Sequence, residues 1–161
     1  MRNLILIIAL FFLTLPAYGQ FAESASEFAG IHLGPDLNID NSWTVLSGGS
    51  IVKDLEGDFE RVFVDVTDTG MEYIFSSKSH SFDLYSGTYE ALTDQFGVPQ
   101  KTEDSLPVPI AQNSDSRAVE IQVRNDLGSV RYTWNEDIEY ETVLMLYSES
   151  GLVVRFDLIS E

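Results

Sequence analysis

The C-terminal part of the chain alternates between apolar and polar residues, and this pattern constrains the fold more than any other feature. Apolar residues recur at every second position in the runs 119–123, 130–134 and 152–158, and residues 140–147 form a fourth, more apolar run. Short sequences rich in Asn, Asp, Ser and Gly separate the runs. Because successive side chains of a strand point to opposite faces of a sheet, the pattern predicts a four-stranded antiparallel meander.

Two further alternating runs precede this region. Residues 59–66 and 71–76 are joined by the turn sequence Thr67–Gly70, and this arrangement predicts a β-hairpin. Residues 43–46 and 51–52 are shorter apolar pieces on either side of a Ser-Gly-Gly-Ser sequence, and we expect them to pair. The segment 100–116 contains two prolines and few periodic apolar residues, so we expect a loop there.

Residues 83–96 have a helical period instead. Their apolar residues recur at spacings of four, three and four, which forms one stripe of an amphipathic helix. The stripe consists of Tyr85, Tyr89, Leu92 and Phe96. Gly97 and Pro99 follow and predict the end of the helix. Since an apolar sheet face needs a covering layer, we predict an α+β domain: the hairpin and the meander form an antiparallel sheet packed by this one main helix.

The N-terminus has the three parts of a secretory signal peptide. Arg2 supplies a positive charge, residues 4–15 are apolar except for one threonine, and Ala17-Tyr18-Gly19 is a small-x-small cleavage sequence. The alternative is a retained membrane anchor, but 12 helical residues cover only about 18 Å of a hydrocarbon core of roughly 30 Å. We therefore expect cleavage after Gly19 and a protein without a membrane anchor, either periplasmic or secreted.

In the remaining chain, the secondary-structure pattern is less clear in residues 20–42 than in residues 43–161. Residues 20–42 have loose helical spacing interrupted by Gly30 and Gly34, and they fit either a short helix or a packed N-terminal arm. Residues 43–161 carry the strand and helix patterns, and we expect them to form a single domain.

The composition excludes several classes of function. With 26 Asp and Glu against 9 Lys and Arg, the net charge of −17 repels the phosphates of nucleic acids and anionic lipids. It suits cationic partners, divalent ions or simple solubility. The absence of cysteine removes disulfides, thiol catalysis and cysteine metal sites, so stability must come from a hydrophobic core.

One predicted strand is apolar on both faces. In residues 140–147, Leu144 and Leu146 fit the core face, whereas Val143, Met145 and Tyr147 fall on the opposite face. Together with Val153 of the next strand, those three would form an apolar patch on the polar side of the sheet. Two explanations stay open: the N-terminal arm covers the patch, or the patch is exposed and binds a partner.

The sequence contains no recognisable catalytic, cofactor-binding or metal-ligating pattern. His32 and His80 are far apart in the sequence and have no ligand spacing. Asp36, Asn38 and Asp40 have the spacing of the first three oxygen ligands in a calcium-binding loop. The glycine and the glutamate that should follow in such a loop are missing. Acidic runs at 54–60 and 136–141 could supply a carboxylate pair for glycoside hydrolysis, although so acidic a chain brings carboxylates together by chance. Trp134 could stack on a sugar. In an alternating strand, however, it lies on the same face as Val130, which favours a place in the core.

These observations favour a non-enzymatic module that binds a protein or glycan outside the cytoplasm. Its candidate partner-binding residues are Val143, Met145, Tyr147 and Val153. The alternatives are an extracytoplasmic hydrolase that uses carboxylates and a calcium-dependent module. No cofactor is expected.

Overall fold

A computed structural model describes residues 27–34, 37–68, 70–109, 116–135 and 141–159. The chain separates into two compact units between Leu33 and Gly34. In the first unit, β1 (Glu27–Phe28) and β2 (Ile31–His32) form a small antiparallel pair. Ala29 and Gly30 make the turn between them with φ angles of 48° and 75°. These residues therefore form a hairpin, and the predicted helical spacing has no counterpart between residues 27 and 32.

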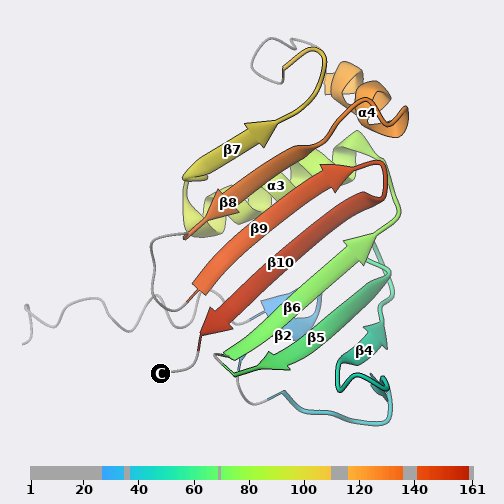
Figure 1. Cartoon of the computed structure of the whole chain (residues 1–161), viewed down its shortest axis with the longest axis vertical. Coiled ribbons are helices and arrows are strands. Elements are labelled where there is room, and N and C mark those ends of the chain that lie inside the picture. Colours follow the sequence, from blue (N-terminus) through green and yellow to red (C-terminus); the bar gives the residue numbers. More distant parts are fainter. Residues whose placement is uncertain (1–26, 35–36, 69, 110–115, 136–140, 160–161) are drawn as a thin grey trace, which may run out of the picture. The chain divides into compact units, whose positions relative to one another are not determined.

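In the described residues of the second unit, eight strands form one antiparallel sheet (Figure 1). Its strands, in spatial order, are β3 (Thr44–Val45), β4 (Ile51–Asp54), β5 (Arg61–Thr67), β6 (Gly70–Ser77), β10 (Gly151–Ile159), β9 (Glu141–Ser148), β8 (Val130–Trp134) and β7 (Lys101–Asp104). The predicted α+β class with an antiparallel sheet is confirmed, as are the β5–β6 hairpin and the β3–β4 pair. Pairing of β6 with β10 joins the N-terminal hairpins to the C-terminal strands.

The predicted main helix is α3 (Phe82–Phe96). It begins where the Ser81 hydroxyl accepts a hydrogen bond from the Leu84 amide, and it ends at Gly97, whose φ of 81° suits glycine. Neither helix of the described residues has the length and hydropathy that would let it cross a membrane.

The second helix, α4 (Ser116–Arg124), corrects the prediction of a strand at residues 119–123. Val119 and Val123 are buried, whereas Ile121 between them is 58% exposed. A strand would place all three on one face, but a helix places only the residues four apart together. The predicted loop at 100–116 is also wrong in part, because its first residues form the edge strand β7.

The core lies between α3 and one face of the sheet, and α3 is seen behind β8 and β9 in Figure 1. The Tyr85 ring stacks on Tyr147 with ring centroids 4.7 Å apart. The ring centroids of Tyr89 and Trp134 lie 6.0 Å apart. At the other end of the helix, the Phe96 ring lies 6.4 Å from that of Phe156. These contacts define a helix side of the sheet; we call the other side the open face.

Buried tyrosine and tryptophan side chains find hydrogen-bond partners for their polar ends. The Tyr85 and Tyr132 hydroxyls lie 2.7 Å apart, and Tyr147 donates to the His80 carbonyl at 2.6 Å. Burial raises the pKa of Tyr147 to about 12 and shifts the pKa of Tyr85 upward as well. Trp134 Nε1 donates to the Gly97 carbonyl at 2.9 Å, which fixes the end of α3 to β8.

Candidate binding surface

The structure places three of the four predicted partner-binding residues in the core. Val143, Met145 and Tyr147 are fully buried on the helix side, so the face assignment of β9 was wrong. Val153 alone lies on the open face, half-buried. The reason is that both faces of β9 are apolar, and the aromatic stripe of α3 packs against the set that contains Tyr147.

Strand register brings a different apolar set together on the open face. Val52 is opposite Phe63, Phe63 is opposite Ile74, and Leu146 is opposite Val153. Arg155 lies between Ile74 on β6 and Leu144 on β9. We call these apolar residues the open-face patch: Val52, Phe63, Ile74, Leu144, Leu146 and Val153.

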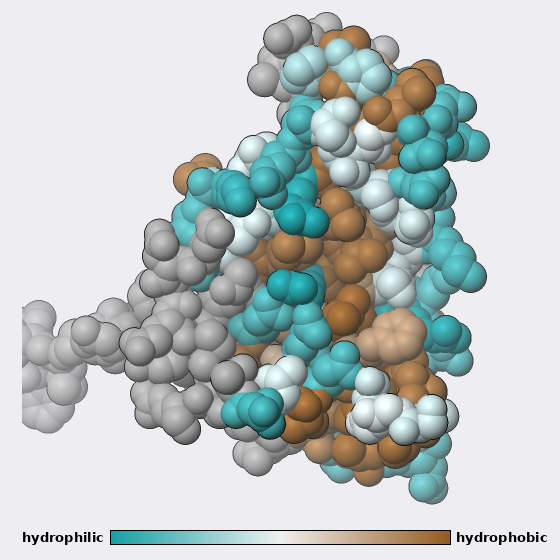
Figure 2. Space-filling view, in the orientation of Figure 1, coloured by the Kyte–Doolittle hydropathy of each residue, from teal (hydrophilic) through white to brown (hydrophobic). Residues whose placement is uncertain are grey.

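Every side chain of the open-face patch is partly exposed. Figure 2 looks onto this face and shows apolar side chains at the surface along the middle of the sheet. In Figure 1, α3 runs behind the sheet and α4 lies at its upper end, so neither helix lies in front of the strands that carry the patch. The patch is therefore a partly exposed apolar surface, interrupted by the Arg155 side chain, that the described helices leave uncovered.

Three carboxylates border the open-face patch. Asp65, Glu72 and Asp157 are cross-strand neighbours on β5, β6 and β10, and we call them the acidic row. Arg155 binds two of them: its Nη1 lies 3.3 Å from Glu72 Oε1, and its Nη2 lies 2.8 Å from Asp157 Oδ2.

The environment of Glu72 shows that the acidic row is crowded with negative charge. Burial raises the pKa of Glu72, and the carboxylates of Asp157 and Asp65 raise it further, although Arg155 acts in the opposite direction. The row thus keeps an excess of negative charge beside an apolar surface.

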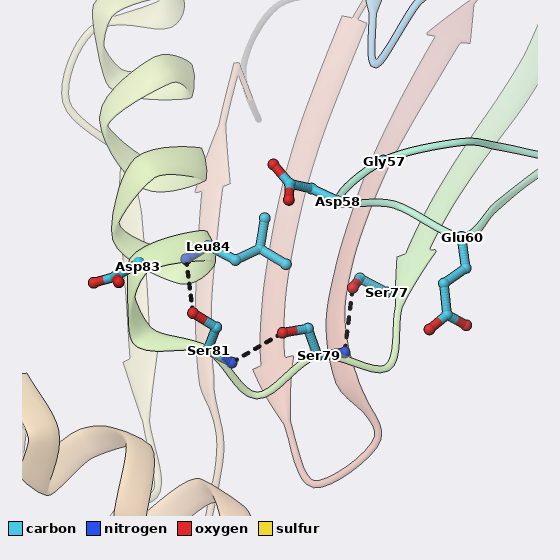
Figure 3. A pocket seen from close by; sticks show the side chains of 8 residues that line it. All are labelled: Gly57, Asp58, Glu60, Ser77, Ser79, Ser81, Asp83 and Leu84. Atoms are coloured by element: carbon cyan, nitrogen blue, oxygen red, sulfur yellow. Dashed lines mark hydrogen bonds between the residues drawn. The ribbon is translucent and has the colours of Figure 1, made fainter.

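A polar pocket of about 400 Å³ lies elsewhere, before the start of α3 (Figure 3). Its lining residues are Gly57, Asp58, Glu60, Ser77, Ser79, Ser81, Asp83 and Leu84. The three serine hydroxyls accept hydrogen bonds from the amides of Ser79, Ser81 and Leu84, so they serve the backbone of this loop.

The carboxylates of the pocket do not form a catalytic pair. Figure 3 shows the side chains of Asp58, Glu60 and Asp83 pointing in different directions and not toward a common point. A glycosidase needs two carboxyl groups facing each other across roughly 5 to 10 Å. This arrangement gives the hydrolase alternative no support.

The calcium-like segment at residues 36–40 is described only in part. Asp40 of the calcium-like segment accepts hydrogen bonds from the Ser42 amide and hydroxyl, which lower its pKa, while Asp36 lies outside the described residues. Among the residues that the structure describes, no three His, Asp or Glu side chains are arranged so that they could hold a metal ion. His80 Nε2 contacts the Glu149 carbonyl and thereby fixes a loop. Trp134 is fully buried, as its alternation predicted.

Residues 136–140 of the acidic run at 136–141 also lie outside the described part. No protein-family model matches the chain, and neither does any curated protein or solved structure with which it was compared.

Proposed function

We propose that this chain is an exported, non-enzymatic binding module that holds a protein partner on its open face. The observation that carries the proposal is the open-face patch. Apolar side chains that gather on one face of a soluble protein are a common feature of binding surfaces. The patch also extends over five adjacent strands, from Val52 on β4 to Leu144 on β9. The central strands of that sheet are paired on both sides, which gives the surface a rigid support.

The chemistry of the patch favours a protein over a glycan. Sugars bind to flat aromatic faces, and the patch has one aromatic residue, Phe63, whose ring is approached by the Arg61 guanidinium at 5.9 Å. The other five side chains are aliphatic. Aliphatic surface gains free energy mainly by excluding water against another apolar surface, which a protein can supply.

Export is the part of the proposal that rests on residues 1–19 alone. We expect the protein recovered from the periplasm or culture medium to begin at Gln20, because Ala17 and Gly19 fit the cleavage sequence. Intact-mass measurement of the recovered protein, tagged at its C-terminus, tests this. Recovery of the full-length chain from the membrane fraction would contradict it.

Binding through the open face is tested with a photo-crosslinking residue. We expect a crosslinker at Leu146 to capture one defined protein from envelope and medium fractions, because Leu146 lies at the edge of the patch beside Val153. The matched control carries the same residue at Ile121, which is 58% exposed on α4. Equal capture from both positions, or none from Leu146 in a folded protein, would refute the proposal.

A further inference from the structure

We infer that the partner presents an amphipathic helix with basic side chains along one side of its apolar stripe. This inference rests on the proposed function and specifies the occupant of the same surface. It follows from three properties of the open face: its backbone pairing, its dimensions and its charge.

Backbone pairing excludes a single extended peptide. Strands β6, β10 and β9 each pair with a neighbour on both sides, so their backbone groups are not available to a ligand on the face. A peptide lying there must satisfy its own amides and carbonyls, since buried unpaired backbone groups are costly. A helix does this internally. The helix side of the same sheet already holds one, α3, through an apolar stripe.

The dimensions of the open-face patch match a short helix. From Val52 on β4 to Leu144 on β9 there are four spacings between strands, or about 19 Å at roughly 4.8 Å each. A helix rises about 1.5 Å per residue, so about 13 residues cover this distance. The helix α3 on the other side has 15 residues.

The acidic row sets the charge of the partner. Asp65 and Glu72 are each two positions along their strands from Phe63 and Ile74, which places them about 7 Å to one side of the patch. Lysine or arginine side chains beside the apolar stripe of a docked helix can span that distance. Three carboxylates face one guanidinium, Arg155, so the border attracts cations.

A second copy of the chain fits less well than such a helix. The full chain carries a net charge of −17, removal of residues 1–19 with Arg2 leaves it no less acidic, and a face-to-face dimer would bring two acidic rows to one interface. Like charges at an interface oppose association. The complementary partner is therefore basic.

The test uses a 14-residue peptide of leucine and lysine in a helical pattern as the probe. We expect it to bind the protein at least about tenfold more tightly than a Leu/Glu peptide of the same pattern, because opposite charges attract across the border. A scrambled Leu/Lys peptide has the same charge without an apolar stripe, and we expect binding as weak as that of the Leu/Glu peptide. Fluorescence anisotropy with labelled peptides measures all three.

Variants locate the peptide on the surface. The pair Asp65→Asn and Glu72→Gln should weaken binding about threefold to tenfold, in the range of partly screened ion pairs. The control pair Glu90→Gln and Asp94→Asn removes the same charge from the exposed side of α3 and should leave binding unchanged. Equal effects of the two pairs would overturn the inference, because they would indicate non-specific attraction to an acidic protein.

The inference and the proposed function fail in different ways. If the crosslinker at Leu146 captures a partner but the Leu/Lys peptide binds no better than the scrambled one, the basic-helix inference is wrong and the binding function stands. A dimer in light scattering that Leu146→Lys dissociates would make a second copy the occupant. Failure of both the crosslink and the peptide would remove the binding function as well.

Discussion

We expect the replacement of Met145 with aspartate to unfold the protein. Met145 is fully buried on the helix side of β9, opposite Tyr132 on β8 and Val154 on β10. A carboxylate at this position loses its hydration and gains no partner, which costs at least about 4 kcal/mol. Since the whole domain is expected to be stable by only about 5–15 kcal/mol, we expect loss of the native circular dichroism signal or of the cooperative urea transition.

The adjacent residue supplies the matched control. Leu146 lies on the open face between Arg131 and Val153, half-buried at the surface. Because an aspartate there keeps its water and has an arginine beside it, we expect Leu146→Asp to cost less than about 1.5 kcal/mol in urea unfolding. The reverse order of effects would mean that the two faces of β9 are exchanged and that the open-face patch belongs to the core.

The contrast between these two residues marks the limit of sequence reasoning for the binding surface. Alternation correctly predicts a strand at 140–147, but it divides the residues into two sets of similar hydrophobicity. Which set is buried depends on the layer that covers it. The aromatic stripe of α3 meets Tyr147 by ring stacking, whereas Leu144 and Leu146 offer no ring. Matching aromatic stripes between helix and strand could have indicated the correct face.

Short elements were predicted less well for physical reasons that differ between them. In α4, the sequence Val119-Glu120-Ile121-Gln122-Val123 alternates, yet a four-residue spacing is present as well. Tertiary contacts chose the helix: Val119 and Val123 are buried, and the buried Gln122 side chain binds the Val108 backbone. Strand β7 is exposed at every position, so no apolar pattern existed to predict it.

The acidic row and the open-face patch depend on pairing between distant segments. Asp65 and Glu72 are brought together by the predicted β5–β6 hairpin, but Asp157 joins them only because β10 pairs with β6. Local turns specify which strands form hairpins, whereas no local signal specifies how two hairpin groups join in one sheet. The strands that carry the patch, β4, β5, β6, β9 and β10, were therefore predictable, and the surface that they build was not.

A second large effect is expected where the β9–β10 turn meets β6. Gly151 has a φ of 101°, and a Cβ added there would lie 2.9 Å from Lys78 Cα and closer still to the Ser77 carbonyl oxygen. Both are backbone atoms, which cannot rotate away as a side chain could. We expect Gly151→Ala to lower the free energy of unfolding by more than about 3 kcal/mol, since strain and overpacking act together. Urea unfolding at neutral pH measures it.

Gly49→Ala separates backbone strain from overpacking. Gly49 has a similar φ of 91°, but a Cβ there has no atom within 4 Å, so only the conformational cost of about 1 kcal/mol applies. If Gly151→Ala lowers the free energy of unfolding no more than Gly49→Ala does, the turn does not pack against Ser77. The larger loss would establish close packing between β10 and β6, and with it the pairing that places Asp157 beside Glu72. The free energy of unfolding of the Gly151→Ala variant thus tests the β6–β10 junction, on which the acidic row depends.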